Sequence, residues 1–141
     1  MTEAFITPTR EDYTRFMDLE IEGPVHMLNL IKLRHRAAYE DGRDVTGEQA
    51  YATYSELSAP FFAGVGGQVI WQGRAQMTLI GSGDGDAWDF GFIAAYPSKA
   101  AIDAMFNDPG YQAITFHRSA AIENSRLHCF AVTQHRQGSL V

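Results

Sequence analysis

The adjacent pair His117 and Arg118 carries the most suggestive chemistry in this sequence. A histidine exchanges protons near neutral pH, and an arginine guanidinium holds a carboxylate or enolate oxygen through its planar fork. If the segment 109–122 is helical, Arg118 shares one stripe of the helix with Tyr111, and His117 lies at the border of that stripe. We therefore expect both groups to face a cleft between helix and sheet. They are the candidate catalytic residues, His117 as acid or base and Arg118 as stabiliser of negative charge.

A structural interpretation of the same pair stays open. Arg118 then pairs with a local carboxylate such as Glu123, and His117 is an interface or surface residue. Under this interpretation neither residue touches a ligand.

Asn29 is a second candidate because it interrupts the apolar run Val25–Leu33 (VHMLNLIKL). A buried amide needs a partner, so Asn29 either satisfies backbone groups at a strand irregularity or faces a cavity and binds a ligand. Tyr54, Trp71 and Tyr111 complete the candidate ligand-binding residues. They are aromatic core or pocket lining, with phenol and indole tips that need partners.

Other motifs predict structure rather than chemistry. We expect His26 and His128 to form a structural cross-strand pair, because neither is followed by another metal ligand at a suitable spacing. The sequence GSGDG at 81–85 is GxGxG between two strands, which indicates a hairpin turn and excludes a dinucleotide fingerprint. Cys129 is the single cysteine and reads as a small buried hydrophobe. No metal and no cofactor are expected.

The elements that position these residues follow from hydrophobic periodicity and from capping residues. We expect helices where apolar residues recur every three or four positions, and strands where short apolar runs are bounded by glycine, proline or polar turns. The first part of the chain predicts a helix within 7–22 capped at Thr7-Pro8, a strand at Val25–Leu33, a loop at 34–45 and a helix at about 47–62 that begins at a Thr46-Gln49 capping box. The middle predicts a long strand at 68–80 kinked at Gly73, a turn at 81–86 and a strand at 88–96. The last part predicts a helix capped by Pro97-Ser98, a second helical run from Pro109 to 122, a strand at 127–133 and a frayed tail at 134–141.

The order strand, helix, strand, strand, helix, strand over residues 25–133 predicts an α+β, ferredoxin-like domain: a four-stranded antiparallel sheet with helices on one face. Residues 1–24 form an N-terminal helical extension, and residues 134–141 form a C-terminal tail. The strand at 88–96 is apolar on both faces, so something must cover the second face of the sheet. We expect a homodimer with the sheets packed face to face.

Composition narrows the classes of partner. The chain has 141 residues, 45% of them apolar, and a formal net charge of −6, which fits one globular domain and predicts no general attraction to nucleic acid or to an anionic membrane. No run approaches ~18 apolar residues, so no bilayer span is expected. The start MTEAFITPTRED lacks the basic and then apolar pattern of a secretory signal, so we expect a cytoplasmic protein.

Several segments together resemble the family called domain of unknown function 1330, in its longer branch, over about Val25 to Val132. They are MLNLIKL at 27–33, Gly42-Arg43-Asp44-Val45-Thr46-Gly47 with Ala50-Tyr51, Gly66-Gly67 with Val69 and Trp71, Trp88-Asp89, Tyr96-Pro97-Ser98, Asp108-Pro109-Gly110-Tyr111-Gln112, His117-Arg118 and Ser125-Arg126-Leu127. The resemblance implies a dimeric alpha+beta barrel but no particular reaction. That wider group includes cofactor-free monooxygenases, haem-degrading enzymes, muconolactone isomerases, haem peroxidases and stress-induced binding proteins. The haem-site spacing of its haem-degrading members is not reproduced by Asn29 and His117.

Two functional hypotheses follow. In the first, each subunit of a homodimer encloses a mainly apolar pocket between sheet and helices. It binds a small organic molecule through Arg118, His117 and Asn29, with cofactor-free proton-transfer or monooxygenase chemistry. In the second, the protein is a non-catalytic stress-type or ligand-binding dimer in which these polar residues only satisfy the fold. A packed interior without a cavity favours the second hypothesis.

Overall fold

Four antiparallel strands form the sheet of this computed structural model, which describes residues 4–82 and 87–133. The strand order is β2-β3-β1-β4, and each neighbouring pair is antiparallel. The strands are β1 (Val25–Leu33), β2 (Gln68–Arg74), β3 (Phe90–Tyr96) and β4 (Ile122–Ala131). This is the ferredoxin-like α+β arrangement that the order of elements predicts.

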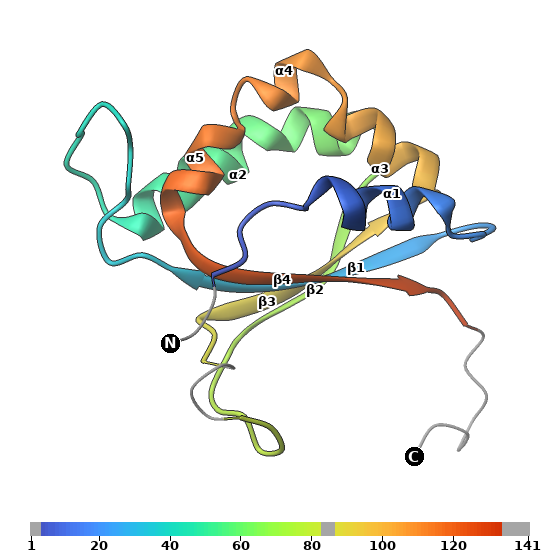
Figure 1. Ribbon diagram of the computed structural model, residues 1–141, viewed down its shortest axis with the longest axis horizontal. Coiled ribbons are helices and arrows are strands. Elements are labelled where there is room, and N and C mark those ends of the chain that lie inside the picture. Colours follow the sequence, from blue (N-terminus) through green and yellow to red (C-terminus); the bar gives the residue numbers. More distant parts are fainter. Residues whose placement is uncertain (1–3, 83–86, 134–141) are drawn as a thin grey trace.

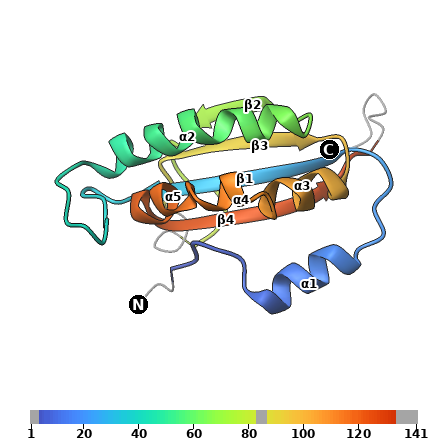
Figure 2. The ribbon, with the colours of Figure 1, turned by 90° about the horizontal axis from the view of Figure 1, so that it is seen from above.

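The helices lie on one face of this sheet, as Figure 1 shows. Seen from above in Figure 2, α1 lies beyond the edge strand β4, whereas the remaining helices lie over the strands. The helix furthest from the sheet is α4, which stands above the gap between α3 and α5 in Figure 1. The helices are α1 (Arg10–Asp18), α2 (Gly47–Gly64), α3 (Lys99–Phe106), α4 (Pro109–Gln112) and α5 (Thr115–Ala121).

Side-chain caps set the starts of the main helices. The Thr46 hydroxyl accepts a hydrogen bond from the Gln49 backbone N–H at 3.0 Å, and the Gln49 side chain accepts one from the Thr46 N–H at 2.9 Å. This reciprocal pair is the predicted capping box. The hydroxyl of Ser98 likewise accepts from the Ala101 N–H at 3.1 Å and begins α3, as predicted.

Two helix predictions need correction. The first helix begins at Arg10, because the Thr9 hydroxyl and not Thr7 accepts from a helix N–H, that of Asp12 at 3.0 Å. The run 109–122 is two short helices, α4 and α5, separated by residues 113–114. The separation lets α4 stand away from the sheet while α5 packs near it.

The strand β2 ends at Arg74, and the prediction that it reaches residue 80 is wrong. Just beyond Arg74, the Ala75 N–H donates to the Asp89 carbonyl at 3.0 Å, and the Asp89 N–H donates to the Ile31 carbonyl at 2.8 Å. The Asp89 carboxylate also accepts from the Leu33 N–H at 2.7 Å. The register is irregular between Val69 and Trp71 rather than at Gly73, which pairs regularly with β3.

At the other end of the chain, β4 starts at Ile122 rather than at residue 127. Residues 123–126 are polar and hide the strand from a hydrophobicity pattern, but Ile122 and the residues from Asn124 onward pair with β1. The predicted turn at 81–86 lies largely outside the described residues, and so does the tail at 134–141. Within residues 4–82 and 87–133, no helix combines the length and the apolar character that a membrane span requires.

The two faces of the sheet differ. On the helix side, the core contains fully buried aliphatic side chains from strands and helices, namely Val25, Ile31, Ile102 and Ile122. Because side chains alternate along a strand, Leu28 and Leu30 point to the other side. Cross-strand pairing extends this second surface, which we call the open face: His26, Leu28, Leu30, Lys32, Trp71, Ile93, Arg126, His128 and Phe130.

Candidate functional site

Arg118 is a partly buried cation that pairs with no carboxylate in the part of the chain that the structure describes. From α5, its Nη1 donates to the backbone carbonyl of Ile6 in the N-terminal segment. The charge of Arg118 lowers the pKa of Tyr51 and of Tyr111, against the larger effect of burial, which raises both. None of the ion pairs among the described residues includes Arg118. A guanidinium held in this way, with further N–H donors uncommitted, is a ready binding point for an anion.

The ion-pair partner expected for Arg118 under the structural interpretation is wrong. Glu123, the carboxylate expected to pair with Arg118, instead lies 3.1 Å from the ammonium of Lys32, between Oε2 and Nζ. Arg118 therefore keeps its charge uncompensated by the nearest acidic residue in sequence.

Two tyrosines lie in the same layer and bond to each other. The hydroxyl of Tyr54, on α2, is 2.7 Å from the hydroxyl of Tyr111, on α4. Burial raises the pKa of Tyr111 above its ordinary value, the neighbouring Tyr54 raises it further, and Arg118 opposes the shift. Tyr111 therefore stays protonated at physiological pH. Because two hydroxyls share one hydrogen bond, one phenolic proton of the pair remains to donate to a third group.

Asn29 lies on the helix side of the central strand β1, opposite Phe92 and Leu127. Its Nδ2 donates to the Met27 carbonyl at 3.1 Å, while Oδ1 accepts no hydrogen bond from the described residues. Leu127 is 40% exposed although its side of the sheet carries the helices. Solvent therefore reaches the sheet beside Asn29, and the strand irregularity that one interpretation of Asn29 required lies elsewhere, at Lys32.

Arg118, Tyr54, Tyr111 and Asn29 are called the inner cluster below. Three of its members come from the helix layer and one from the sheet beneath it. Phe92 packs against both hydrophobic clusters of the helix side, so it lies at the centre of the apolar surface beside Asn29. The inner cluster offers one cation, two hydroxyls and one amide on the helix side of the sheet, beside aromatic and aliphatic side chains.

His117 does not join this cluster, which corrects the prediction that both members of the pair face one cleft. Its ring is buried on the side of the loop 34–45, where Nδ1 lies 2.6 Å from the Tyr39 hydroxyl. The Arg43 guanidinium stacks over the Tyr39 ring at 4.1 Å. Burial lowers the pKa of His117, and the charge of Arg43 lowers it further. His117 is therefore neutral at pH 7 and is held by a buried neutral partner.

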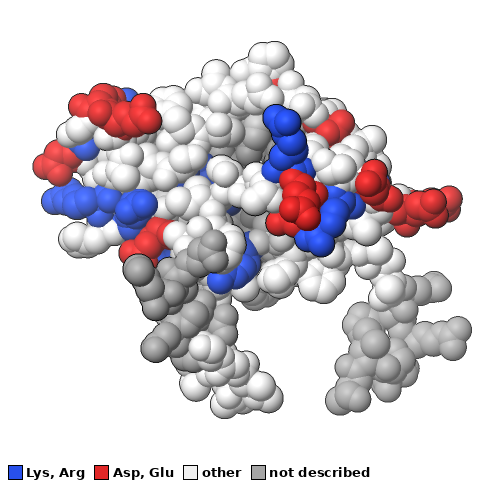
Figure 3. Space-filling view, viewed as in Figure 1, with Lys and Arg blue, Asp and Glu red and all other residues white. Residues whose placement is uncertain are grey.

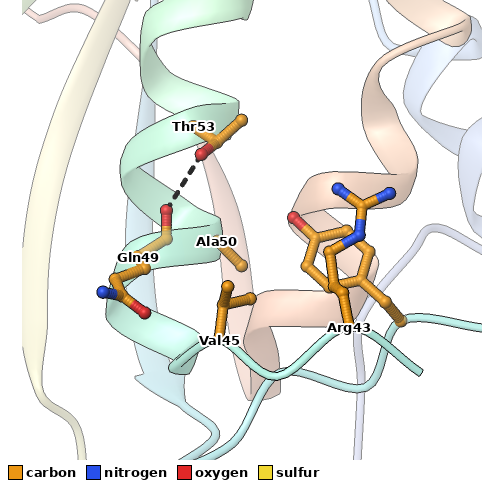
Figure 4. Close-up of a pocket in the computed structure, with 6 residues that line it drawn as sticks. Arg43, Val45, Gln49, Ala50 and Thr53 are labelled. Atoms are coloured by element: carbon orange, nitrogen blue, oxygen red, sulfur yellow. Dashed lines mark hydrogen bonds between the residues drawn. The ribbon is translucent and has the colours of Figure 1, made fainter. Parts of the chain in front are cut away.

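A small hollow lies beside the bonded pair of Tyr39 and His117. Figure 4 shows Arg43 on one side of it and Gln49 and Thr53, from α2, on the other. Its volume is about 70 Å³. Liquid water occupies ≈30 Å³ per molecule, so this hollow has room for a water or two but not for an organic ligand.

Trp71 is the remaining predicted site residue, and it lies on the open face. Trp71 points away from Tyr54 and Tyr111, since it pairs with Ile93 on the side opposite the helices, so the structure does not bring it into the inner cluster. His26 and His128 share this face on neighbouring strands, as expected. They are diagonal rather than directly paired, because His26 lies opposite Phe130 and His128 opposite Leu28.

The N-terminal segment makes contacts with β4 and with α5. The Phe5 N–H donates to Asn124 Oδ1 at 2.9 Å, and the Ser125 hydroxyl donates to the Phe5 carbonyl at 2.6 Å. These bonds place Ile6 against Arg118. No local motif predicts a contact between residues so far apart in the chain.

A wider hollow of about 410 Å³ separates α1 from α3. Within it the Tyr13 hydroxyl donates to Asp103 Oδ1 at 2.5 Å, and burial together with this carboxylate raises the pKa of Tyr13 to about 12. Among the residues of known position, no three His, Cys, Asp or Glu side chains converge as a metal site would require. The wider hollow is lined by Arg10 as well as by Tyr13, and the smaller one by Arg43, which pairs with Asp41.

Comparison with known proteins establishes the family. The model of the domain of unknown function DUF1330 matches residues 42–130, more than half of the chain. The chain belongs to the DUF1330 family. The match includes Tyr54, Tyr111 and Arg118 of the inner cluster, whereas Asn29 precedes it.

This DUF1330 chain is similar over nearly its whole length to a solved structure. The RPA0582 protein of unknown function from Rhodopseudomonas palustris is 46% identical, over 94% of this chain and 100% of that chain, with a TM-score of 0.88. No curated protein matches the chain.

More distant structures share the DUF1330 chain's fold alone. SnoaB, a cofactor-independent oxygenase from Streptomyces nogalater, is 19% identical over 80% of this chain and 96% of that chain, with a TM-score of 0.51. A dimeric protein of unknown function and ferredoxin-like fold from Bacteroides fragilis is 13% identical over 80% of this chain and 100% of that chain, with a TM-score of 0.50. These two structures confirm the ferredoxin-like fold class and assign no activity.

Proposed function

We propose that this DUF1330 protein binds a small, largely apolar organic acid between its helices and its sheet, with Arg118 holding the carboxylate or enolate oxygens. The observation that carries the proposal is the partly buried Arg118 guanidinium, which among the described residues bonds to a backbone carbonyl and to no carboxylate. A charge removed from water without a counter-charge is costly, and a bound anion removes that cost.

Each member of the inner cluster has a distinct role in this proposal. Arg118 uses Nη1 for the Ile6 carbonyl, so its Nε and Nη2 edge is the fork that takes the anion. The bonded pair of Tyr54 and Tyr111 donates its remaining phenolic proton to a second oxygen. Asn29 Oδ1 accepts from a hydroxyl or N–H of the ligand, and the aromatic walls hold its apolar body.

The protein acts as a homodimer in this proposal, with two open faces packed against each other. The support is the composition of the open face, where Leu28, Leu30, Ile93, Trp71 and Phe130 form an apolar surface that no helix covers. Large apolar patches of this kind mark interfaces. A ligand on the helix side and a partner on the open face do not compete for the same surface.

The catalytic form of the proposal is proton transfer or cofactor-free oxidation of the bound acid. Arg118 then stabilises an enolate. His117, whose Nδ1 is committed to the Tyr39 hydroxyl, keeps Nε2 for the exchange of a proton. The non-catalytic form is a binding module, which retains the same anchors. Incubation of a bound acid under oxygen, followed by mass analysis of the released compound, separates the two forms.

The binding proposal is tested by calorimetric titration with 2-naphthoate and with its neutral counterpart 2-naphthamide. We expect the carboxylate to bind at least tenfold more tightly than the amide, because only the carboxylate pairs with Arg118. Arg118→Gln keeps a donor for the Ile6 carbonyl but removes the charge, and should abolish this preference.

The matched control is Arg36→Gln, which removes an exposed guanidinium that pairs with Asp44. It should leave the preference intact. Equal affinity of the wild type for the two compounds, or an unchanged preference in Arg118→Gln, would contradict the proposal.

A further inference from the structure

The segment that follows β2 presents three large apolar side chains to water. We call residues 75–82 the arm. Met77, Leu79 and Ile80 are 75%, 85% and 93% exposed, which makes them the most exposed large hydrophobic residues among those described. Single exposed apolar side chains are ordinary, but three within four consecutive positions form a patch that calls for a partner.

The arm lies on the same side as the open face. It leaves the sheet after the Ala75 N–H donates to the Asp89 carbonyl at 3.0 Å. In Figure 1 it is the yellow-green lobe below the sheet, on the side away from the helices. The arm therefore projects past its own sheet, into the space that a partner packed on the open face would occupy.

Charge favours a second copy of this chain as that partner. The arm contains no charged residue, and its part of Figure 3 is white. On the open face, Glu123 neutralises Lys32, and the Arg126 guanidinium lies over the rings of Phe5 and Trp88. Two copies can thus meet across the apolar part of this face with few like charges opposed.

We propose that the arms are exchanged in the dimer, so that Met77, Leu79 and Ile80 of each subunit pack on exposed apolar strand residues of the other copy. The receiving surface includes Trp71 and Phe130, which lie on the open face and are more than half exposed in the single chain. This inference rests on the proposed face-to-face dimer and adds a second, projecting contact to it. This projecting contact holds the two copies together in addition to the packing of their open faces.

The direct test uses a mixed dimer of methyl-labelled and unlabelled subunits, in an isotope-filtered nuclear Overhauser experiment. Exchange of the arms predicts intermolecular signals from the methyl groups of Met77, Leu79 and Ile80. If intermolecular signals come from Leu28 and Ile93 but none from the arm, the exchange is wrong and the face-to-face dimer stands. A protein that sediments as a monomer overturns both.

A variant test measures the energetic contribution of the arm. The triple substitution Met77→Ser, Leu79→Ser and Ile80→Ser changes only exposed positions, so the subunit should fold normally. We expect the dimer dissociation constant to rise at least a hundredfold in sedimentation equilibrium. The control Leu57→Ser alters an exposed leucine of α2 and should leave that constant unchanged. A triple variant that dimerises like the wild type would overturn the exchange.

Discussion

The two faces of the sheet are formed by the same strands but differ in how their side chains are covered. On the helix side, the hydroxyls of Tyr54 and Tyr111 satisfy each other, and the apolar residues are buried within one chain. On the open face, aromatic residues such as Trp71 and Phe130 remain exposed, and the arm adds three more apolar side chains beyond it. The helix side is complete as a folded core but holds an unneutralised cation, whereas the open face lacks a cover.

The two faces of the sheet therefore fit two different kinds of partner. A guanidinium without a counter-charge beside aromatic side chains binds a small anion, and an apolar sheet face packs against a large apolar surface. In Figure 3, charged side chains gather near the loop 34–45 and near α1, and a smaller basic patch lies between them. Substitutions on one side should therefore affect one partner and spare the other.

The largest expected effect comes from opening the helix-side core. Ile31 is fully buried, so Ile31→Ala leaves a cavity and should lower the free energy of unfolding by about 2–5 kcal/mol in urea denaturation. The matched change at an exposed position, Leu57→Ala on α2, should cost much less. Similar losses for both variants would mean that the helix side is not the stabilising face.

The open face should respond in assembly rather than in folding. Trp71→Asp places a carboxylate in the proposed interface and should raise the dimer dissociation constant at least a hundredfold, which is about 2.7 kcal/mol. Because Trp71 is exposed in the single chain, the circular dichroism spectrum of the subunit should be unchanged. Trp71→Phe, which keeps an apolar ring, should retain the dimer, and a Trp71→Asp protein that still dimerises would remove the open face from the interface.

A smaller effect is expected at the loop side of α5. Tyr39→Phe removes the hydroxyl that pairs with buried His117 and leaves its Nδ1 without a partner, at a cost of about 1–3 kcal/mol. A double-mutant cycle with His117→Gln isolates the pair, because the two losses should not add. Additive losses would show that the hydroxyl and the imidazole do not depend on each other.

The smallest effect concerns pH. The folded chain lowers the pKa of His117 below the ordinary value of 6.5, so the unfolded chain binds this proton more readily. The contribution of His117 to stability is therefore complete above about pH 7 and is lost as pH falls below about 6.5. Urea denaturation at pH 7.5 and pH 5.5 should show a smaller decrease in His117→Gln than in the wild type, and a larger decrease would reverse the sign of the argument.

Local signals were sufficient for much of the fold. The apolar run Val25–Leu33 forms a strand with those bounds, and the capping residues Thr46 and Ser98 begin helices where predicted. Such features depend on a few neighbouring residues, so the sequence contains them. The end of β2 is not among them, because the apolar alternation continues to Leu79 whereas the pairing with the neighbouring strand ends near Asp89.

The candidate site was only partly predictable for the same reason. Arg118, Tyr54 and Tyr111 were recognised by residue type, and the structure brings them into one layer. The separation of His117 from Arg118 depends on Tyr39, in a loop whose conformation follows no periodic pattern. The contact of Ile6 with Arg118 likewise depends on hydrogen bonds to distant β4.

One measurement tests the division between the two faces most directly: native mass spectrometry of the protein with added 2-naphthoate, which reports assembly and ligand count together. Ionic contacts such as a carboxylate on Arg118 persist in the gas phase, so bound ligand should be retained. The account predicts a dimer that takes up two naphthoates without dissociating. A single naphthoate per dimer, which would place the ligand at the interface, or a monomer with or without ligand, would contradict it.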